Sequence, residues 1–119
     1  MSKIKHFSDM PVWQETVDAT VRIYELTKGF PQSEKYGVTN QLRRAAVSIS
    51  CNIAEGYGRS SSGDKKRFYD MARGSAFEVQ NLLLIGSRLD IIDETESNDL
   101  FLKLGSIIHA LNKMKISLV

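Results

Sequence analysis

The pattern of hydrophobic and polar positions is most informative between residues 41 and 59. Positions 45–54 carry no charge, and at 100° per residue the apolar residues of this region fall on one side of a helix. That apolar line contains Leu42, Ala46, Ile49 and Ile53. Residues 47–53 also alternate strictly with a period of two, which is typical of a half-buried strand. Helix formers on both flanks favour a helix, and we expect it to be covered on more than one side.

Three other segments repeat apolar residues at helical spacing. The first begins at Pro11, which suits the first turn of a helix with Asp9 as a cap, and it is expected to end at Gly29. Its apolar positions are Trp13, Val17, Thr20 or Val21, and Tyr24. The third helix is expected to follow a serine cap at Ser61 or Ser62 and to present a heptad seam. That seam consists of Phe68, Ala72, Ser75, Val79, Leu82, Gly86 and Leu89.

The last segment has the most regular seam, and Asp93 with Glu96 forms a variant of the capping box before it. The seam residues are Leu100, Leu104, Ile107, Leu111, Met114 and Leu118. Gly37 predicts a break between the first and second helices. Four amphipathic segments joined by short turns predict an all-α, antiparallel up-down four-helix bundle. We expect one domain over residues 1–119, with helices at about 11–29, 33–57, 63–90 and 94–118.

A polar line runs along the expected second helix beside its apolar line. It consists of Gln41, Arg44, Ser48, Asn52, Glu55 and Arg59. This is the one constellation that could form a catalytic site, but a structural hydrogen-bond network is the stronger interpretation, because serine and asparagine can fix the register of packed helices. Unpaired buried charge is costly, so we expect Arg44 and Glu55 to pair with Glu78 and Arg67 of the third helix. The expected network is Gln41, Ser48, Asn52, Glu55 and Glu78, and no residue is assigned as catalytic.

Cofactor and metal chemistry is not supported by the residue pattern. Neither His6 nor His109 follows a glutamate by three residues, as the metal motif of helical bundles requires. Cys51 is the single cysteine, and its uncharged surroundings predict a buried, inert thiol. No glycine loop matches a phosphate-binding fingerprint. We therefore expect no metal and no cofactor.

Charge is segregated along the chain although the net charge is only +2. Positions 90–99 hold five acids and no base. A basic cluster of Arg59, Lys65, Lys66 and Arg67 marks the turn between the second and third helices. Together with Arg43 and Arg44 these are the candidate nucleic-acid-binding residues, and the scarcity of aromatic neighbours predicts contact with phosphates rather than with bases. A solvated charged surface is the alternative interpretation of the same cluster.

The location expected from the sequence is the cytoplasm. The first ten residues contain no apolar run like that of a signal peptide. No stretch approaches the length of a membrane-spanning helix. A membrane partner is therefore not expected.

Several short motifs together resemble a known family. They are Trp13-Gln14, Phe30-Pro31, Glu34 with Tyr36-Gly37, residues 41–46 (QLRRAA), Ser48, residues 52–56 (NIAEG), Arg59, and Ala72 with Gly74-Ser75 and Glu78. The chain is similar to the four-helix-bundle family named for proteins encoded in intervening sequences of bacterial 23S ribosomal RNA. That resemblance implies an up-down bundle, a ring-like homopentamer and no known enzymatic activity. It also implies kinship with the accessory protein of diversity-generating retroelements, which binds nucleic acid.

The function that we expect combines these observations. It is a non-enzymatic, self-associating helical bundle that binds RNA or DNA through a basic surface. The main alternative is a scaffold or adaptor that binds a protein partner, such as a reverse transcriptase, through the ring without touching nucleic acid. A small hydrolase that uses the polar line is a third, weaker hypothesis.

Overall fold

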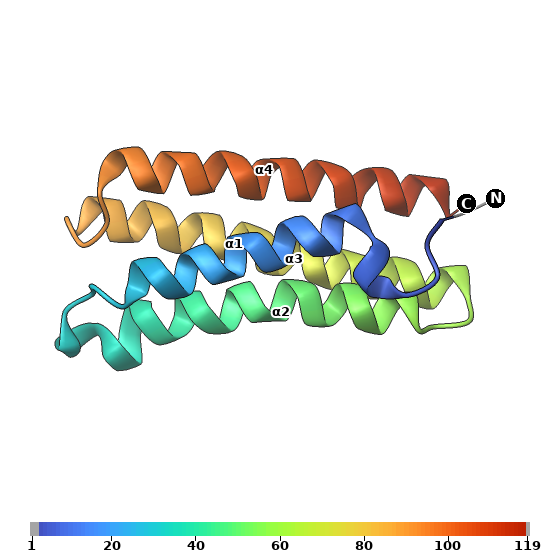
Figure 1. Ribbon diagram of the computed structural model, residues 1–119, viewed down its shortest axis with the longest axis horizontal. Helices are drawn as coiled ribbons and strands as arrows, with labels where there is room; N and C mark the ends of the chain where they lie inside the picture. Colours follow the sequence, from blue (N-terminus) through green and yellow to red (C-terminus); the bar gives the residue numbers. More distant parts are fainter. Residues whose placement is uncertain (1–2, 119) are drawn as a thin grey trace.

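Four long helices lie side by side along one axis in the computed structural model, which describes residues 3–118 (Figure 1). They are α1 (Pro11–Thr27), α2 (Asn40–Tyr57), α3 (Ser62–Arg88) and α4 (Glu94–Ser117). Consecutive helices run in opposite directions, and residues 3–118 contain no strand. The all-α fold expected from the sequence is confirmed. Positions 1, 2 and 119 of the expected domain lie outside the described residues.

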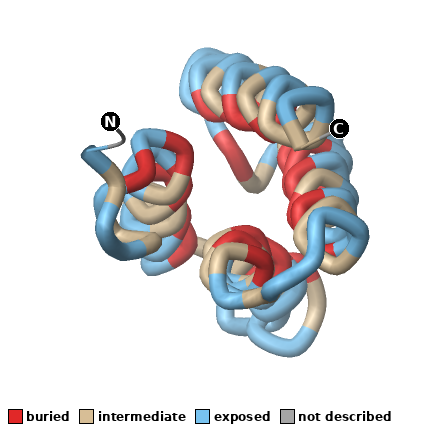
Figure 2. The backbone as a smooth tube through the Cα atoms, turned by 90° about the vertical axis from the view of Figure 1, so that its right-hand side faces the viewer, coloured by how far each residue is buried: buried red, intermediate tan, exposed pale blue. Residues whose placement is uncertain are grey.

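The helices enclose a shared core (Figure 2). Each helix packs on the next one in the chain, and α1 also contacts α4. The contact between α2 and α3 is the most extensive, and the contact between α1 and α4 is the smallest of these four. Seen end-on, the pair α1 and α2 therefore lies opposite the pair α3 and α4.

The apolar lines of α2, α3 and α4 supply most of the core. Residues 47–53 are helical, and the whole apolar line expected for α2 is buried. In α4 the buried seam is Leu100, Leu104, Ile107 and Leu111. The seam of α3 is confirmed at Phe68, Ala72, Val79, Leu82 and Gly86. Leu89, its expected last member, follows the end of α3 and is 56% exposed.

The buried side of α1 is shifted by one residue from the side that its large apolar residues indicate. Its buried residues are Val12, Thr16, Ala19, Ile23 and Thr27. The hydroxyls of Thr16 and Thr27 donate to the carbonyls four residues earlier, each at 2.8 Å, so both threonines can be buried without an unpaired polar group. Two of the expected apolar positions, Val21 and Tyr24, are exposed instead.

The connection from α1 to α2 breaks at a glycine, as expected. It contains the short helical turns η2 (Gln32–Glu34) and η3 (Lys35–Thr39). Within η3 the backbone of Gly37 leaves the helical region, with φ −101° and ψ −116°. α2 therefore begins at Asn40 rather than near residue 33.

The remaining helix starts follow local capping chemistry. The Ser61 hydroxyl accepts from the Asp64 amide at 3.1 Å before α3, and the Asp93 carboxylate accepts from the Glu96 amide at 3.2 Å before α4. α1 has Met10 at its cap position and no side-chain cap. Asp9 belongs to the preceding turn η1 (Phe7–Asp9) and instead accepts from the amides of Lys5 and His6.

Close approach of α2 to α3 depends on a glycine at the end of α2. A Cβ atom at Gly56 would lie 2.7 Å from Cε1 of Tyr69 and 3.1 Å from Cβ of Phe68. Both aromatic residues are buried, so neither has free space to retreat. The glycine therefore fixes the distance between the two helices at this point.

We expect Gly56→Ala to lower the free energy of unfolding by about 1 to 3 kcal/mol, because the added methyl group overpacks the contact. Gly74→Ala is the matched control, since no heavy atom lies within 4 Å of a Cβ at that position of α3. The control should raise the free energy of unfolding by about 0.5 to 1 kcal/mol through helix propensity. Chemical denaturation at one fixed protein concentration measures both variants. Equal effects of the two substitutions would contradict this account of the α2–α3 contact.

Candidate nucleic-acid interface

The basic cluster lies at one end of the bundle, in the turn that joins α2 to α3 (Figure 1). Arg59 lies two residues after the end of α2, and Lys65, Lys66 and Arg67 lie in the first two turns of α3. The described N-terminal segment and the last turn of α4 lie at the same end. The cluster therefore belongs to one compact end of the molecule.

Two arginines of this cluster share one aromatic ring. The guanidinium groups of Arg59 and Arg67 each lie 4.6 Å from the centroid of Phe68. Arg59 also contacts Glu55 at 2.9 Å, whereas Arg67 lies 3.8 Å from Asp64. Cation–π contacts of this kind hold the guanidinium groups in place while their outer edges face solvent.

The neighbouring Lys65 is committed to the protein itself. Its ammonium donates to the carbonyl of Tyr57 at 2.7 Å and to that of Gly56 at 3.3 Å. Both carbonyls are at the C-terminal end of α2, where unpaired carbonyls and the helix dipole favour a cation. Lys66 has neither a hydrogen bond nor an ion pair within residues 3–118. The two adjacent lysines therefore have different roles.

The fold does not place Arg43 and Arg44 near the turn between α2 and α3. They lie in the first part of α2, about 20 Å from Arg59 at the helical rise per residue. Nε of Arg43 donates to the Thr27 hydroxyl at 2.7 Å, and its guanidinium lies 4.7 Å from the ring centroid of Tyr24. Arg43 thus connects α2 to α1, and Arg44 is exposed.

The end of the bundle that contains the turn between α2 and α3 also holds basic residues that were not predicted from the sequence as part of the site. The segment before η1 contains Lys3 and Lys5, and the last part of α4 contains Lys113 and Lys115. They are remote from the turn in sequence, but the up-down order of the helices returns the chain to this end. The antiparallel topology expected from the sequence would have placed them there.

One carboxylate at this end connects α3 to α4. Asp70 accepts from Lys115 at 2.6 Å and from Arg73 at 3.2 Å. The hydrogen bond from Lys115 is the main cause that lowers the pKa of Asp70, and the charges of Lys115 and Arg73 add to it. Asp70 thereby neutralises part of the basic end, whereas Lys66 has no ion pair among the described residues.

The polar network between α2 and α3 is smaller than expected. Oγ of Ser48 and Oγ of Ser75 lie 2.9 Å apart across the two helices. The Asn52 amide donates to the Ser48 carbonyl at 2.9 Å and to the Ser48 hydroxyl at 3.2 Å. Gln41 and Glu78 are exposed. Three residues, one of which is Ser75, therefore form the connected part of this network.

The expected pairs of Arg44 with Glu78 and of Glu55 with Arg67 are wrong. Among the described residues, Glu55 pairs with Arg59 and Arg67 pairs with Asp64, each within one stretch of chain. All these side chains reach solvent, so no buried charge demands a partner on the other helix. The expectation that Cys51 is buried is also wrong, because it lies on the outward side of α2 and is exposed.

The part of the chain that the structure describes contains no cluster of three or more histidine, cysteine or acidic side chains able to hold a metal ion. Among its helices, none is both long and apolar enough to cross a membrane.

Comparisons with known proteins identify relatives of this fold. Residues 8–113 match the family model described as 23S rRNA-intervening sequence protein. A crystal structure of a protein with unknown function from the S23 ribosomal protein family of Bacteroides thetaiotaomicron is similar, with a TM-score of 0.81. The two chains are 22% identical, and the match covers 87% of this chain and 97% of that chain. No curated protein matches the sequence.

The role of Lys65 can be tested against its neighbour. Lys65→Met should lower the free energy of unfolding by about 0.5 to 1.5 kcal/mol, because it leaves carbonyls at the end of α2 without their cation. Lys66→Met should change it by less than about 0.5 kcal/mol, as is usual for a surface substitution. Denaturation curves of the two variants measure the difference. Equal destabilisation would contradict the assignment of Lys65 as a helix cap.

The contact of Asp70 with Lys115 predicts a pH dependence. The folded state lowers the pKa of Asp70, so its contribution to stability is present above the unfolded pKa and is lost as the pH falls through the folded pKa. Asp70→Asn should cost at most about 1 kcal/mol near pH 7, since both side chains reach solvent. The difference between variant and unmodified protein should shrink below about pH 4. A difference that stays constant from pH 7 to pH 3 would rule out this contribution.

Proposed function

Because this chain belongs to the 23S rRNA-intervening sequence protein family, we propose that it is a non-enzymatic helical bundle that self-associates and binds RNA or DNA phosphates through the turn between α2 and α3. The family match indicates no catalytic family and specifies no ligand. The proposal therefore depends on the chemistry of the basic end. It places the protein in the cytoplasm.

The observation that carries the proposal is the pair of arginines on Phe68. Arg59 and Arg67 are held at equal distances from one ring, and Lys66 lies beside them without a partner among the described residues. Guanidinium groups bind phosphate oxygens through paired donors, and a group already held in position loses less conformational freedom on binding. Three cations within nine residues are thus available to neighbouring phosphates.

Sequence readout of bases is not part of the proposal. Phe68 and Tyr69 are buried, so neither of these two rings offers an open face on which a base could stack. Contacts to phosphates carry little sequence information. We expect binding that depends on backbone shape and on salt.

Self-association would strengthen this binding. The family resemblance favours a ring-like homopentamer, in which the basic end would occur five times. Repetition of a modest positive patch raises the local potential and the number of phosphates contacted at once. A single copy of the chain has only a small net charge of +2.

A scaffold or adaptor role is the second candidate function. Uncovered apolar side chains on the helices favour it, because such groups commonly mark protein–protein contacts. In that case the ring would bind a protein, such as a reverse transcriptase, without touching nucleic acid. A gel shift with structured RNA at increasing salt separates the two functions, since only the first predicts a salt-sensitive complex.

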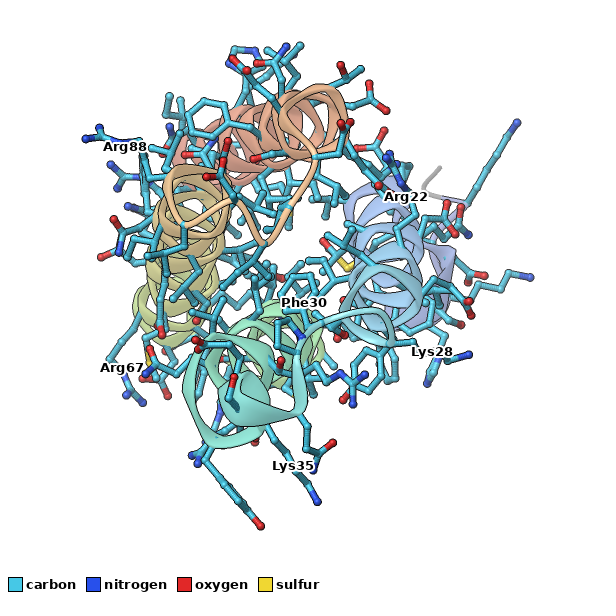
Figure 3. The ribbon with its side chains drawn as sticks, turned by 90° about the vertical axis from the view of Figure 1, so that its left-hand side faces the viewer. Arg22, Lys28, Phe30, Lys35, Arg67 and Arg88 are labelled. Carbon is cyan, nitrogen blue, oxygen red and sulfur yellow. The ribbon has the colours of Figure 1, made fainter. Side chains whose placement is uncertain are left out.

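The proposed site is tested by reversing two charges while Lys65 is kept to preserve the helix cap. Lys66→Glu with Arg67→Glu should abolish binding to a structured RNA or reduce it more than tenfold. The matched control is Lys28→Glu with Arg88→Glu, which makes the same change in net charge at the opposite end of the bundle (Figure 3). Binding by the unmodified protein should weaken steeply between 50 and about 200 mM salt as counterions are released.

Equal loss of affinity in both double variants would show a nonspecific charge effect. It would exclude the turn between α2 and α3 as the binding site for phosphates. Binding that is unaffected by salt would exclude phosphate contact as its basis. Failure of the unmodified protein to bind any RNA or DNA tested would favour the adaptor function.

A further inference from the structure

We infer that the connection from α1 to α2 holds a binding site for the dianionic phosphate group of a small ligand, either a phosphate monoester or inorganic phosphate. The site is a hollow of about 210 Å³ at the end of the bundle opposite the turn between α2 and α3. We refer to it as the connection hollow and define it by Lys28, Lys35, Thr39 and Arg43. It is separate from the proposed nucleic-acid surface, and neither site depends on the other.

The first part of the site is a buried hydroxyl that lacks a partner. Thr39 lines the hollow and is only 9% exposed, and its covered Oγ1 has no hydrogen-bond partner among the described residues. The buried threonines of α1, Thr16 and Thr27, instead donate to carbonyls four residues earlier. An unpaired buried hydroxyl destabilises the fold, so its presence in a native structure calls for an explanation.

The break at Gly37 explains why Thr39 lacks the bond that the other two threonines make. Gly37 lies between Thr39 and the carbonyl of Lys35, and its φ of −101° and ψ of −116° are outside the helical region. The Lys35 carbonyl is therefore out of helical register with the Thr39 hydroxyl. Threonine has two accessible χ1 rotamers in helices, so rotation about one bond can turn this hydroxyl to a ligand oxygen in the hollow.

The second part of the site is a guanidinium group that is already held in position. Nε of Arg43 donates to the Thr27 hydroxyl at 2.7 Å, and that hydroxyl donates onward to the Ile23 carbonyl at 2.8 Å. The ring centroid of Tyr24 lies 4.7 Å from the guanidinium carbon. Both terminal amino groups of Arg43 remain without a hydrogen bond among the described residues. Paired donors of this kind match two oxygens of one phosphate group.

The charges at the hollow favour a dianion. Among the described residues neither Lys35 nor Arg43 makes an ion pair, whereas Lys28 lies 3.4 Å from Glu25. Glu34, next to Lys35 in the chain, does not line the hollow. A phosphate monoester carries a charge of about −1.5 to −2 at pH 7, so it can neutralise both unpaired cations. A carboxylate or a phosphodiester carries a single negative charge and can neutralise only one of them.

The size of the hollow favours a phosphate group over a larger ligand. Pockets that enclose a whole drug-sized molecule have volumes of about 300 to 1,000 Å³, which exceed the volume of the connection hollow. Phe30 and Pro31 form its apolar wall, and Phe30 is anchored because it packs against the core. We therefore expect the hollow to bind the phosphate group and to leave the rest of a phosphate monoester in solvent.

The two lysines complete the site from different sides. Lys28 and Lys35 are exposed, and their side chains extend from the connection in different directions (Figure 3). Their ammonium groups become ordered only when an anion binds, and that ordering costs conformational entropy. We therefore expect each lysine to contribute less to binding than Arg43, which is ordered in advance.

Equilibrium dialysis with radiolabelled inorganic phosphate at constant ionic strength tests the site. The unmodified protein should bind one phosphate per chain in a saturable manner. Arg43→Lys should weaken binding about tenfold or more, since an ammonium group cannot present paired planar donors. Lys35→Met should weaken it about two- to fivefold, as expected for one exposed charge. Lys66→Met, at the opposite end of the bundle, is the matched control and should bind phosphate like the unmodified protein.

A pair of threonine variants separates binding from a purely structural role. Thr39→Val removes an unpaired hydroxyl, so it should keep or raise the free energy of unfolding while it weakens phosphate binding about tenfold. Thr27→Val removes a paired hydroxyl that holds Arg43, so it should lower both stability and affinity. Denaturation curves and dialysis on the same samples measure the two quantities. If Thr39→Val lowers stability and leaves phosphate affinity unchanged, the hydroxyl supports the fold only and the inference is wrong.

Competition with unlabelled compounds identifies the source of the phosphate group. Stronger competition by glycerol 3-phosphate than by inorganic phosphate would identify the ligand as a phosphate monoester, and the reverse order would identify it as inorganic phosphate. Either order supports the site. Dimethyl phosphate should compete about tenfold more weakly than both, because it carries a single charge. Equal competition by this phosphodiester would overturn the assignment of a dianion site.

The remaining outcomes decide against the inference. Absence of saturable phosphate binding by the unmodified protein would overturn it, and so would normal binding by Arg43→Lys. If circular dichroism shows that Arg43→Lys is unfolded, Lys35→Met decides the test, because that position is exposed. RNA binding is measured on the same variants. Lys35→Met should keep its RNA affinity, and Lys66→Glu with Arg67→Glu should keep its phosphate affinity, so failure of either proposal can be distinguished from failure of the other.

Discussion

The close contact between α2 and α3 is the constraint on which the rest of this structure depends. Small residues make it possible, since Gly56 meets Tyr69 directly and Ser48 reaches Ser75. Larger side chains at these positions would separate the helices and uncover the apolar lines that they share. Because α1 packs on α2 and α4 packs on α3, the arrangement of all four helices depends on this contact.

The same contact prepares the basic end. It places Phe68 where arginines from both sides of the turn can lie over its ring. It also brings Lys65 to the last carbonyls of α2. Side-chain contacts therefore restrain both sides of the turn, although its sequence, rich in glycine and serine, resembles a flexible loop. Nucleic acid that met this end would find cations already in position.

The fold could be predicted from the sequence because three helices have regular apolar lines. The line of α1 was misread because its large apolar residues were taken to face the core, whereas the buried side carries Thr16 and Thr27, whose hydroxyls bond to their own helix. The outward position of Cys51 was missed because absence of charge was taken for burial. The basic cluster could be found in the sequence. The separate roles of Lys65 and Lys66 could not, because they depend on where the last carbonyls of α2 lie relative to α3.

An even number of helices in up-down order returns the chain to the end from which it started (Figure 1). Both described chain ends therefore lie at the same end of the bundle as the turn between α2 and α3. A fusion partner or affinity tag at either terminus would crowd this surface, and a tag with its own charge would alter the local potential. The turn after α3 is at the far end of a bundle that spans 47 Å. A label inserted there would report on the molecule without shielding the surface at which nucleic-acid phosphates are expected.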